Sequence, residues 1–203
     1  MKNAIEALSS AKLVPVVKIE SERDALPIAK AVLKGGISVM EVTFRTDAAE
    51  KAVKEIADSL PEMFVGAGTL LSKEQVRAAK NAGAKFFVSP GFNENTADFC
   101  KSENLPFMPG IVTPSELEKA LFYGFDHLKF FPAEAAGGVK MIKALSAPYH
   151  GVKFMPTGGI NLVLPSVFAC GGSFMINKKE IAKGNFESIT EAVKKAVGLI
   201  NTL

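Results

Sequence analysis

Regularly spaced glycines are the feature that most limits what this chain can fold into. They are Gly36, Gly83, Gly124 and Gly171, and each lies just before a short apolar run. Pro61, Pro106 and Pro148 precede other apolar runs at similar spacing. Two strand–helix units fit in each glycine interval, which predicts eight units. Such alternation is typical of a parallel sheet covered by helices, and eight units favour a closed barrel over an open sheet.

The expected fold is therefore a (β/α)8 or TIM barrel with an N-terminal helix, formed by residues 1–203 as one domain. A length of 203 residues is near the lower limit of about 200 for this fold, so its loops must be short. The expected strands are Leu13–Ile19, Val39–Thr43, Phe64–Gly68, Lys85–Ser89, Pro106–Pro109, Leu128–Phe131, Val152–Pro156 and Ser173–Ile176. The expected helices are Asn3–Ser9, Glu22–Leu33, Asp47–Ser59, Ser72–Gly83, Glu94–Ser102, Pro114–Phe122, Val139–Leu145, Asn161–Ala169 and Phe186–Ile200. Asp47 and Ser72 are expected to cap helices, and Gly35–Gly36 to end one in the left-handed conformation.

Composition argues against several classes of partner. Hydrophobic residues make up 48% of the chain, and no apolar run has membrane length. The 24 Lys and Arg residues are scattered among 21 Asp and Glu, so neither nucleic acid nor a membrane surface is expected as a partner. Cys100 and Cys170 are far apart and do not have the spacing of a metal site, and residues 1–11 do not have the pattern of a signal peptide. Both observations indicate a cytoplasmic protein. Only two histidines, His127 and His150, argue against a histidine-rich metal site.

The strand Leu128–Phe131 has a lysine between bulky apolar residues. Lys129 is flanked by Leu128 and Phe130, and Pro132 ends the strand. An ammonium group is almost never fully buried without a partner. Two interpretations stay open, a structural lysine paired with a carboxylate and a nucleophile. Burial disfavours the charged form of an amine, which would free it to attack a carbonyl and form a Schiff base.

A glutamate is expected to face the same interior. In the strand Val39–Thr43, alternation places Glu41 on the inner face, opposite two apolar residues that would pack under helices. The same alternation turns Lys129 inward, so the two side chains could face each other. A structural salt bridge is the alternative to an acid–base role. Arg45 follows at the end of the strand, where it could either clamp a carboxylate or lie solvated in a loop.

The other strand ends are rich in glycine, serine, threonine and proline. These segments are Gly66–Thr69, Ser89–Gly91, Pro109–Pro114, Pro156–Gly159 and Gly171–Ser173. Glycines allow backbone N–H groups to approach a ligand closely. Gly158 and Gly159 follow the expected seventh strand, the usual place of a phosphate site in a barrel, although ordinary turns would also account for them.

Together, these motifs resemble those of the 2-keto-3-deoxy-6-phosphogluconate (KDPG) aldolase family, which includes 4-hydroxy-2-oxoglutarate (KHG) aldolases. The matching segments are Glu41–Thr46, Gly66–Thr69, Val88–Pro90, Met108–Gly110, Thr113–Glu116, Leu128–Glu134, Pro156–Ile160 and Gly171–Ser173. The resemblance runs from about Val14 to the C-terminus, and the segment around Lys129 is the most diagnostic. It implies a class I aldolase of the Entner–Doudoroff pathway, a short barrel that is usually a homotrimer and uses no metal or other cofactor.

The resemblance also implies a role for each site residue. Lys129 forms the Schiff base and Glu41 is the general acid and base. The substrate-binding residues are Arg45 and Thr69 for the carboxylate, Pro90 and Phe131 in the pocket wall, Thr157 beside the substrate, and Gly158, Gly159 and Ser173 for phosphate. Lys18 stands where many family members have arginine. Lysine keeps the charge but not the bidentate fork, so the role of Lys18 stays open.

The implied reaction cleaves KDPG to pyruvate and glyceraldehyde 3-phosphate, and KHG to pyruvate and glyoxylate. Three alternatives remain on sequence grounds. One is an aldolase for the galactonate-derived phosphosugar acid, which differs at one stereocentre. Another is an isomerase or epimerase of a phosphorylated substrate that uses Glu41 as base and Lys129 only as a charge. The last is a binding module without turnover.

Overall fold

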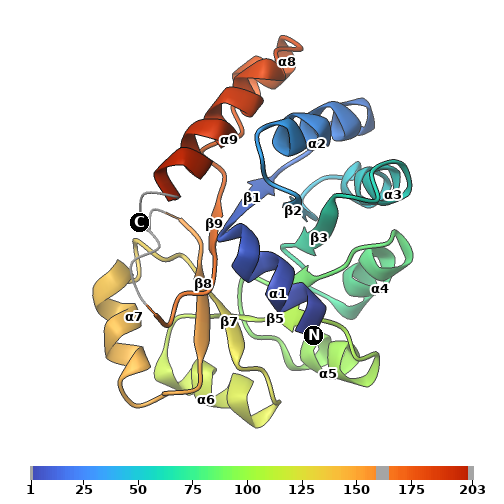
Figure 1. Cartoon of the computed structure of the whole chain (residues 1–203). Helices are drawn as coiled ribbons and strands as arrows, with labels where there is room; N and C mark the ends of the chain where they lie inside the picture. The colour runs from blue at the N-terminus through green and yellow to red at the C-terminus, as the bar shows by residue number, and fades with distance from the viewer. Residues whose placement is uncertain (1, 159–164, 201–203) are drawn as a thin grey trace.

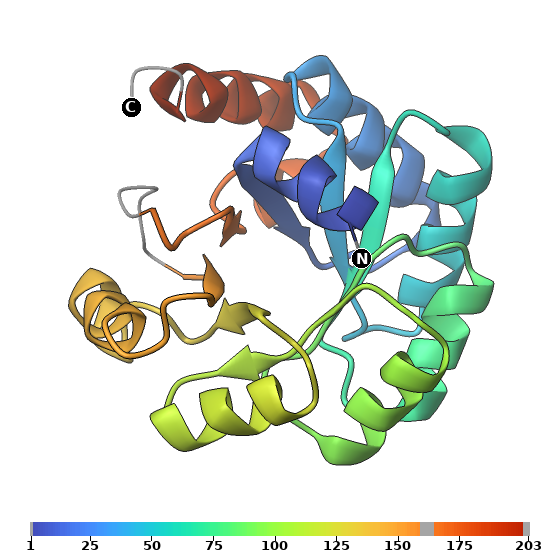
Figure 2. The same cartoon turned by 60° about the horizontal axis from the view of Figure 1, so that its bottom comes forward.

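The computed structural model describes residues 2–158 and 165–200, in which helices alternate with parallel strands. The strands are β1 (Leu13–Val17), β2 (Val39–Thr43), β3 (Phe64–Gly68), β4 (Phe87–Val88), β5 (Phe107–Met108), β6 (Gly110–Ile111), β7 (His127–Phe130), β8 (Lys153–Pro156) and β9 (Cys170–Gly172). The α-helices are α1 (Lys2–Ala11), α2 (Ala25–Lys34), α3 (Ala49–Ser59), α4 (Lys73–Asn81), α5 (Glu94–Ser102), α6 (Pro114–Phe122), α7 (Gly138–Ser146), α8 (Lys178–Ala182) and α9 (Glu187–Ile200), and a 3-10 turn covers Glu22–Asp24. Figures 1 and 2 show most helices around the outside of the strands.

The strands form a curled parallel sheet. Six are ordered β5-β4-β3-β2-β1-β9, and three more are ordered β6-β7-β8. β5 and β6 lie on either side of Pro109, which has no N–H to donate but accepts a hydrogen bond from the Lys129 N–H at 3.0 Å. A single parallel bridge between Thr157 and Gly171 joins the end of β8 to β9. These contacts bring the carboxyl ends of β2, β7, β8 and β9 toward one region.

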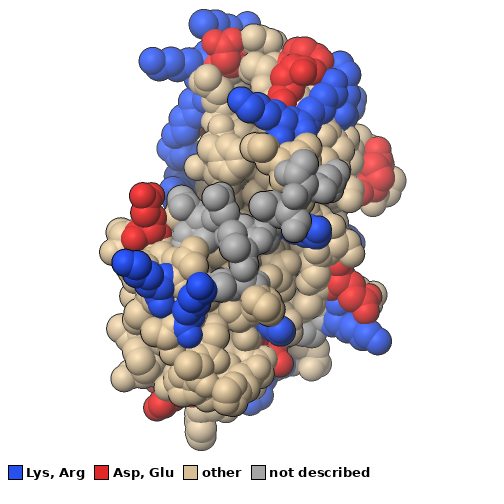
Figure 3. Space-filling view, turned by 60° about the vertical axis from the view of Figure 1, so that its left-hand side comes forward, with Lys and Arg blue, Asp and Glu red and all other residues tan. Residues whose placement is uncertain are grey.

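The two faces of β2 have different surroundings, as the alternation in the sequence predicts. All five residues of β2 are buried. Met40 and Val42 belong to the same apolar cluster as Val32 of α2 and Ile56 of α3, so this face of the strand packs under helices. The opposite face carries Glu41 into the interior. None of the described helices is long and apolar enough to cross a membrane, and Figure 3 shows basic and acidic side chains intermixed on one face.

Several sequence predictions of helix ends are confirmed. α6 has the predicted bounds, and Thr113 and Glu116 form a capping box at its start. The Ser72 hydroxyl accepts a hydrogen bond from the Gln75 N–H and caps α4. Gly36 and Gly83 have φ angles of +100° and +94°, as a glycine after a helix predicts.

The Asp47 cap and the last strand are corrected. The N-cap of α3 is Ala48, because the chain first makes a turn in which the Ala49 N–H donates to the Thr46 carbonyl. The last strand is Cys170–Gly172 rather than Ser173–Ile176, because the Cys170 N–H donates to the Lys12 carbonyl and starts the pairing with β1. Gly171 thus lies inside a strand rather than before one. A Cβ there would lie 2.5 Å from Thr157 Oγ1, so glycine serves a close approach of two strands.

The prediction of a helix at Asn161–Ala169 is also wrong for the residues that the structure describes. Residues 161–164 lie outside the described ranges, and residues 165–169 are not helical. Val167 instead forms a bridge with Phe154, whose N–H donates to the Ser166 carbonyl. Pairing with β8 therefore outweighs the local preference for a helix. α8 has no counterpart among the predicted elements.

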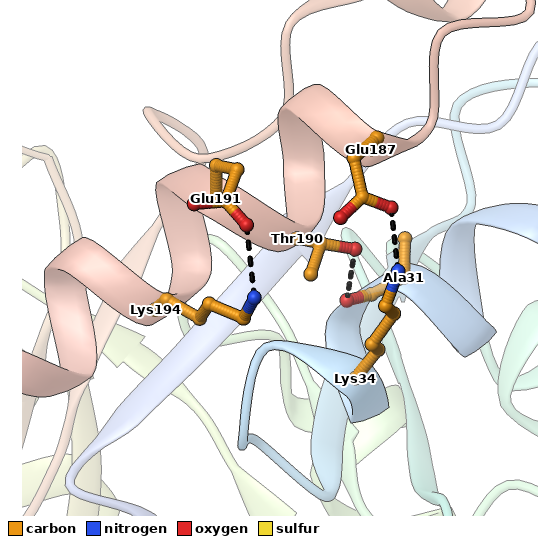
Figure 4. Close-up of polar contacts among 6 residues, drawn as sticks. All are labelled: Ala31, Lys34, Glu187, Thr190, Glu191 and Lys194. Atoms are coloured by element: carbon orange, nitrogen blue, oxygen red, sulfur yellow. Dashed lines mark hydrogen bonds and ion pairs between the residues drawn. The ribbon is translucent and has the colours of Figure 1, made fainter.

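The C-terminal helix packs closely on α2 (Figure 4). The Thr190 hydroxyl donates to the Ala31 carbonyl at 3.1 Å, and Lys34 pairs with Glu187 at 2.7 Å. Gly35 lies against Val193, so that a Cβ on Gly35 would be 2.5 Å from the Val193 Cβ. This approach requires glycine at the end of α2.

Gly35→Ala is expected to lower the free energy of unfolding by about 1–3 kcal/mol, because α2 and α9 must separate to admit the methyl group. Chemical denaturation measures the change. Gly198→Ala in α9 is the matched control, since nothing lies within 4 Å of its Cβ position. Alanine there should leave stability unchanged or raise it by up to about 1 kcal/mol. Wild-type stability in Gly35→Ala would contradict the packing described.

Candidate active site

A buried ion pair occupies the interior of the sheet. Lys129 of β7 is 4% exposed and Glu41 of β2 is fully buried. Lys129 Nζ lies 3.5 Å from Glu41 Oε1 and 5.3 Å from the centroid of the Phe131 ring. The prediction that the two side chains face each other is therefore confirmed. At 3.5 Å the contact is longer than the 2.7–2.9 Å of a strong charge-assisted hydrogen bond, so the amine is only loosely held by the carboxylate.

The end of β3 makes room for the carboxylate. Gly68 pairs with Thr43 in the sheet, and a Cβ on Gly68 would lie 1.7 Å from Glu41 Oε1. Any side chain at this position would push the carboxylate out of its place. Glycine is thus required at position 68, because the Glu41 carboxylate occupies the space that a side chain would fill.

An arginine–threonine contact lies just beyond these strands. Arg45 Nε donates to the Thr69 hydroxyl at 3.1 Å. Thr69 has a φ angle of +58°, a conformation that non-glycine residues rarely adopt. Such a strained position at the end of a strand is typical of a functional site. Arg45 is exposed, so its other guanidinium nitrogens can contact a ligand.

A cavity of about 630 Å³ opens beside the buried pair. This volume suits a small-molecule ligand. Its wall includes five residues predicted to belong to the site, namely Arg45, Phe131, Thr157, Gly158 and Ser173. Lys129 and Glu41 are not part of this wall, but Phe131, whose ring lies near the Lys129 amine, and Thr43, two residues after Glu41 in β2, both belong to it. The cavity and the pair therefore adjoin each other near the carboxyl ends of the strands.

Two buried oxygens in this region have no hydrogen-bond partner among the described residues. They are Glu41 Oε2 and Thr157 Oγ1. Buried polar atoms are usually paired, because an unpaired one costs about 1–3 kcal/mol. Of these two residues, Thr157 lines the cavity, whereas Glu41 does not.

The remaining predicted site residues are placed less directly. Thr69 and Pro90 are not among the residues of the cavity wall. Thr69 contacts Arg45, and the Pro90 carbonyl lies so close to Gly110 that a Cβ there would be 2.1 Å from its oxygen. Gly159 lies outside the described residues.

The two cysteines are unsuited to be nucleophiles. Cys170 lies in the cavity wall and Cys100 is buried elsewhere. Burial raises the pKa of each thiol to about 12. Both thiols are protonated at neutral pH, and the thiolate is the reactive form. Lys129 is thus the better-placed nucleophile near the cavity.

Sequence reasoning missed part of the cavity wall. Phe174 and Ile176 were assigned to a strand, and Lys178 to no element, although all three line the cavity. Lys18, whose role the sequence left open, lines it too. A correct position for the last strand would have placed residues 173–177 in the loop that follows it and Lys178 just after that loop, at the carboxyl end of the sheet.

Comparisons with known proteins identify one family. The family model for aldolases described as KDPG and KHG aldolase matches residues 4–192. The 2-dehydro-3-deoxy-phosphogluconate aldolase of Treponema pallidum is 42% identical over the whole of both chains. The KDPG aldolase of Legionella pneumophila, solved with pyruvate captured as a covalent carbinolamine, superposes with a TM-score of 0.90 at 39% identity, over 94% of this chain and 96% of that one. The aldolase of Zymomonas mobilis with 3-phosphoglycerate superposes at 0.88 with 36% identity, over 96% and 93%.

Gly68→Ala is expected to destabilise the protein by about 1–3 kcal/mol, because the new methyl group overlaps the Glu41 carboxylate. In a Glu41→Ala background the clash is absent. The double-mutant cycle should therefore show a coupling energy of about 0.5–3 kcal/mol, measured by denaturant unfolding. Gly91→Ala, with open space at its Cβ position, is the control. Additive effects of the two substitutions would contradict the arrangement.

Proposed function

The chain belongs to the KDPG and KHG aldolase family, and from this premise we propose that it is a class I aldolase that cleaves KDPG to pyruvate and glyceraldehyde 3-phosphate. The observation that carries the proposal is the Lys129–Glu41 pair, buried beside a cavity of small-molecule size. The carbinolamine of the Legionella enzyme is an adduct of the type that a lysine amine forms with pyruvate. We also propose cleavage of KHG to pyruvate and glyoxylate, in line with the name of the family.

Lys129 is the nucleophile in this mechanism. Its neutral amine attacks the 2-keto carbon and gives a carbinolamine, which loses water to become an iminium ion. The iminium accepts the electron pair released when the C3–C4 bond breaks. The products of this step are an enamine of pyruvate and the aldehyde. Protonation of the enamine at C3 and hydrolysis release pyruvate and restore the amine.

Glu41 moves the protons. Its carboxylate takes the proton of the C4 hydroxyl as the C3–C4 bond breaks, and the same group can protonate the carbinolamine oxygen when water leaves. The contact with Lys129 and the unpaired Oε2 support this role, since one oxygen faces the amine and the other has no hydrogen-bond partner among the described residues. Proton transfer of this kind contributes about 10²–10⁴-fold in rate.

The remaining residues bind the substrate in this proposal. Arg45 and Thr69 hold the carboxylate, and their mutual hydrogen bond supports a shared role. Thr157 offers its unpaired hydroxyl beside the substrate. Phe131 and Pro90 shape the pocket, and Gly158, Gly159 and Ser173 receive the phosphate. Gly158 and Ser173 line the cavity, which supports their part in the assignment.

Further features of the proposal concern the whole protein. We propose that residues 1–203 form one domain in which β5–β6 act as one strand and the sheet closes into an eight-stranded barrel. The strand break at Pro109 and the Thr157–Gly171 bridge support this closure. The resemblance further implies a cytoplasmic homotrimer that acts in the Entner–Doudoroff pathway without a metal. The iminium itself serves as the electron sink, so the mechanism has no step that needs a metal ion.

The alternatives from the sequence lead to different measurements. An aldolase for the galactonate-derived acid would show a higher kcat/KM for that stereoisomer than for KDPG. An isomerase or epimerase would convert a phosphorylated substrate without releasing pyruvate, and a binding module would show no turnover. The family membership favours aldol cleavage over the isomerase and the binding module, and the names of the Treponema and Legionella relatives favour KDPG over the galactonate-derived acid.

Borohydride reduction in the presence of pyruvate and a chelator is expected to attach one reduced pyruvyl group to Lys129, which peptide mass spectrometry locates. Lys129→Met should abolish both the adduct and pyruvate release from KDPG. Lys153→Met is the control, because Lys153 lies in the neighbouring strand outside the cavity wall. A variant without Lys129 that still cleaves KDPG would refute the mechanism.

Glu41→Gln should separate proton transfer from Schiff-base formation. The amide keeps the size of the side chain but cannot take a proton, so kcat is expected to fall by about 10²–10⁴-fold. The pyruvate adduct at Lys129 should still be trapped. Single-turnover kinetics and borohydride trapping on the same preparation measure the two effects. A Glu41→Gln enzyme with wild-type kcat would rule out the acid–base role.

A further inference from the structure

The mouth of the cavity carries more positive charge than the carboxylate clamp requires. Three cationic side chains line the cavity, namely Lys18, Arg45 and Lys178. Arg45 is engaged with Thr69. Lys18 and Lys178 have no part in the roles described above, and they come from distant parts of the chain, after β1 and in α8.

One carboxylate joins these two lysines. Glu20 Oε1 lies 2.8 Å from Lys18 Nζ and 3.8 Å from Lys178 Nζ. The hydrogen bond from Lys18, together with the charges of both lysines, lowers the pKa of the Glu20 carboxyl, so the group is ionised at neutral pH. Glu20 is more than half exposed, and exposed ion pairs of this kind are weak and exchange partners readily.

We propose that Lys178 is a further binding residue for the phosphate of the substrate, and that Glu20 holds Lys178 and Lys18 together at the cavity mouth until the phosphate displaces it. This inference rests on the proposed function and names a residue that determines preference for phosphorylated substrates. Ser173 and Lys178 line the same cavity, with Ile176 between them in sequence. The segment after β9 therefore brings a hydroxyl and an ammonium to the same cavity.

The charges suit this exchange. A phosphate monoester carries a charge of about −1.5 to −2 at pH 7, whereas a carboxylate carries −1. Three cations with Glu20 leave a net charge of +2 near the mouth, enough to attract a substrate that has both a carboxylate and a phosphate. A substrate without phosphate gains little from Lys178, because Arg45 already serves its carboxylate.

Lys178→Met tests the proposal, because it should weaken binding of KDPG, which has a phosphate, but not binding of pyruvate, which has none. The KM for KDPG is expected to rise about threefold to tenfold with kcat changed less than twofold, as loss of one exposed charge–charge contact predicts. The pyruvate concentration for half-maximal borohydride inactivation should stay within twofold, because pyruvate has no phosphate. Glu20→Gln should lower the KM for KDPG by about twofold to fivefold, since no carboxylate then competes.

Lys179→Met is the matched control. Lys179 is the next residue of the same helix and is exposed, but it does not line the cavity. Its replacement should leave both values unchanged. The role of Lys178 would be overturned if Lys178→Met left the KM for KDPG unchanged, or if Lys179→Met raised it equally. It would also be overturned if Lys178→Met raised the pyruvate concentration for half-maximal inactivation as much as the KM for KDPG. A raised KM for KDPG in Glu20→Gln would overturn the role of Glu20. Failure of the proposed function is distinct, because the wild-type protein would then form no pyruvate adduct.

Discussion

The contact between Lys129 and Glu41 is the interaction on which the rest of the site depends. Two opposite charges are removed from water in the interior, and each would be costly to bury alone. The pair can exist only if β2 and β7 both turn these residues inward and if β3 ends in a residue without a side chain. The sheet is therefore built around the space that the pair needs, and the cavity opens beside it.

Three glycines create this space, because other groups can approach their backbone closely. Gly68 admits the Glu41 carboxylate, Gly171 admits the Thr157 side chain, and Gly110 admits the Pro90 carbonyl. In each case the glycine lies in or at the end of a strand and has no positive φ angle. These glycines are required for proximity. The glycines that end helices, such as Gly36 and Gly83, are required for their backbone conformation.

This distinction explains how much the sequence could predict. Period-two alternation placed Glu41 and Lys129 on inner faces, and the capping residue Ser72 located the start of α4, because these signals are local. The last strand was misplaced because Gly171 was expected to precede a strand, whereas it lies within one and contacts Thr157, which is distant in the sequence. The same error hid Lys178. Neither its position beside the cavity nor its link to Lys18 through Glu20 follows from local pattern.

The unpaired oxygens of Glu41 and Thr157 have a consequence for how this protein could change over generations. Substitutions that removed or satisfied these atoms internally would make the fold more robust to heat. They would also deprive a bound molecule of its partners. Selection for thermal stability alone would therefore tend to lower the catalytic rate of this protein. The interior is thus a compromise between stability and activity.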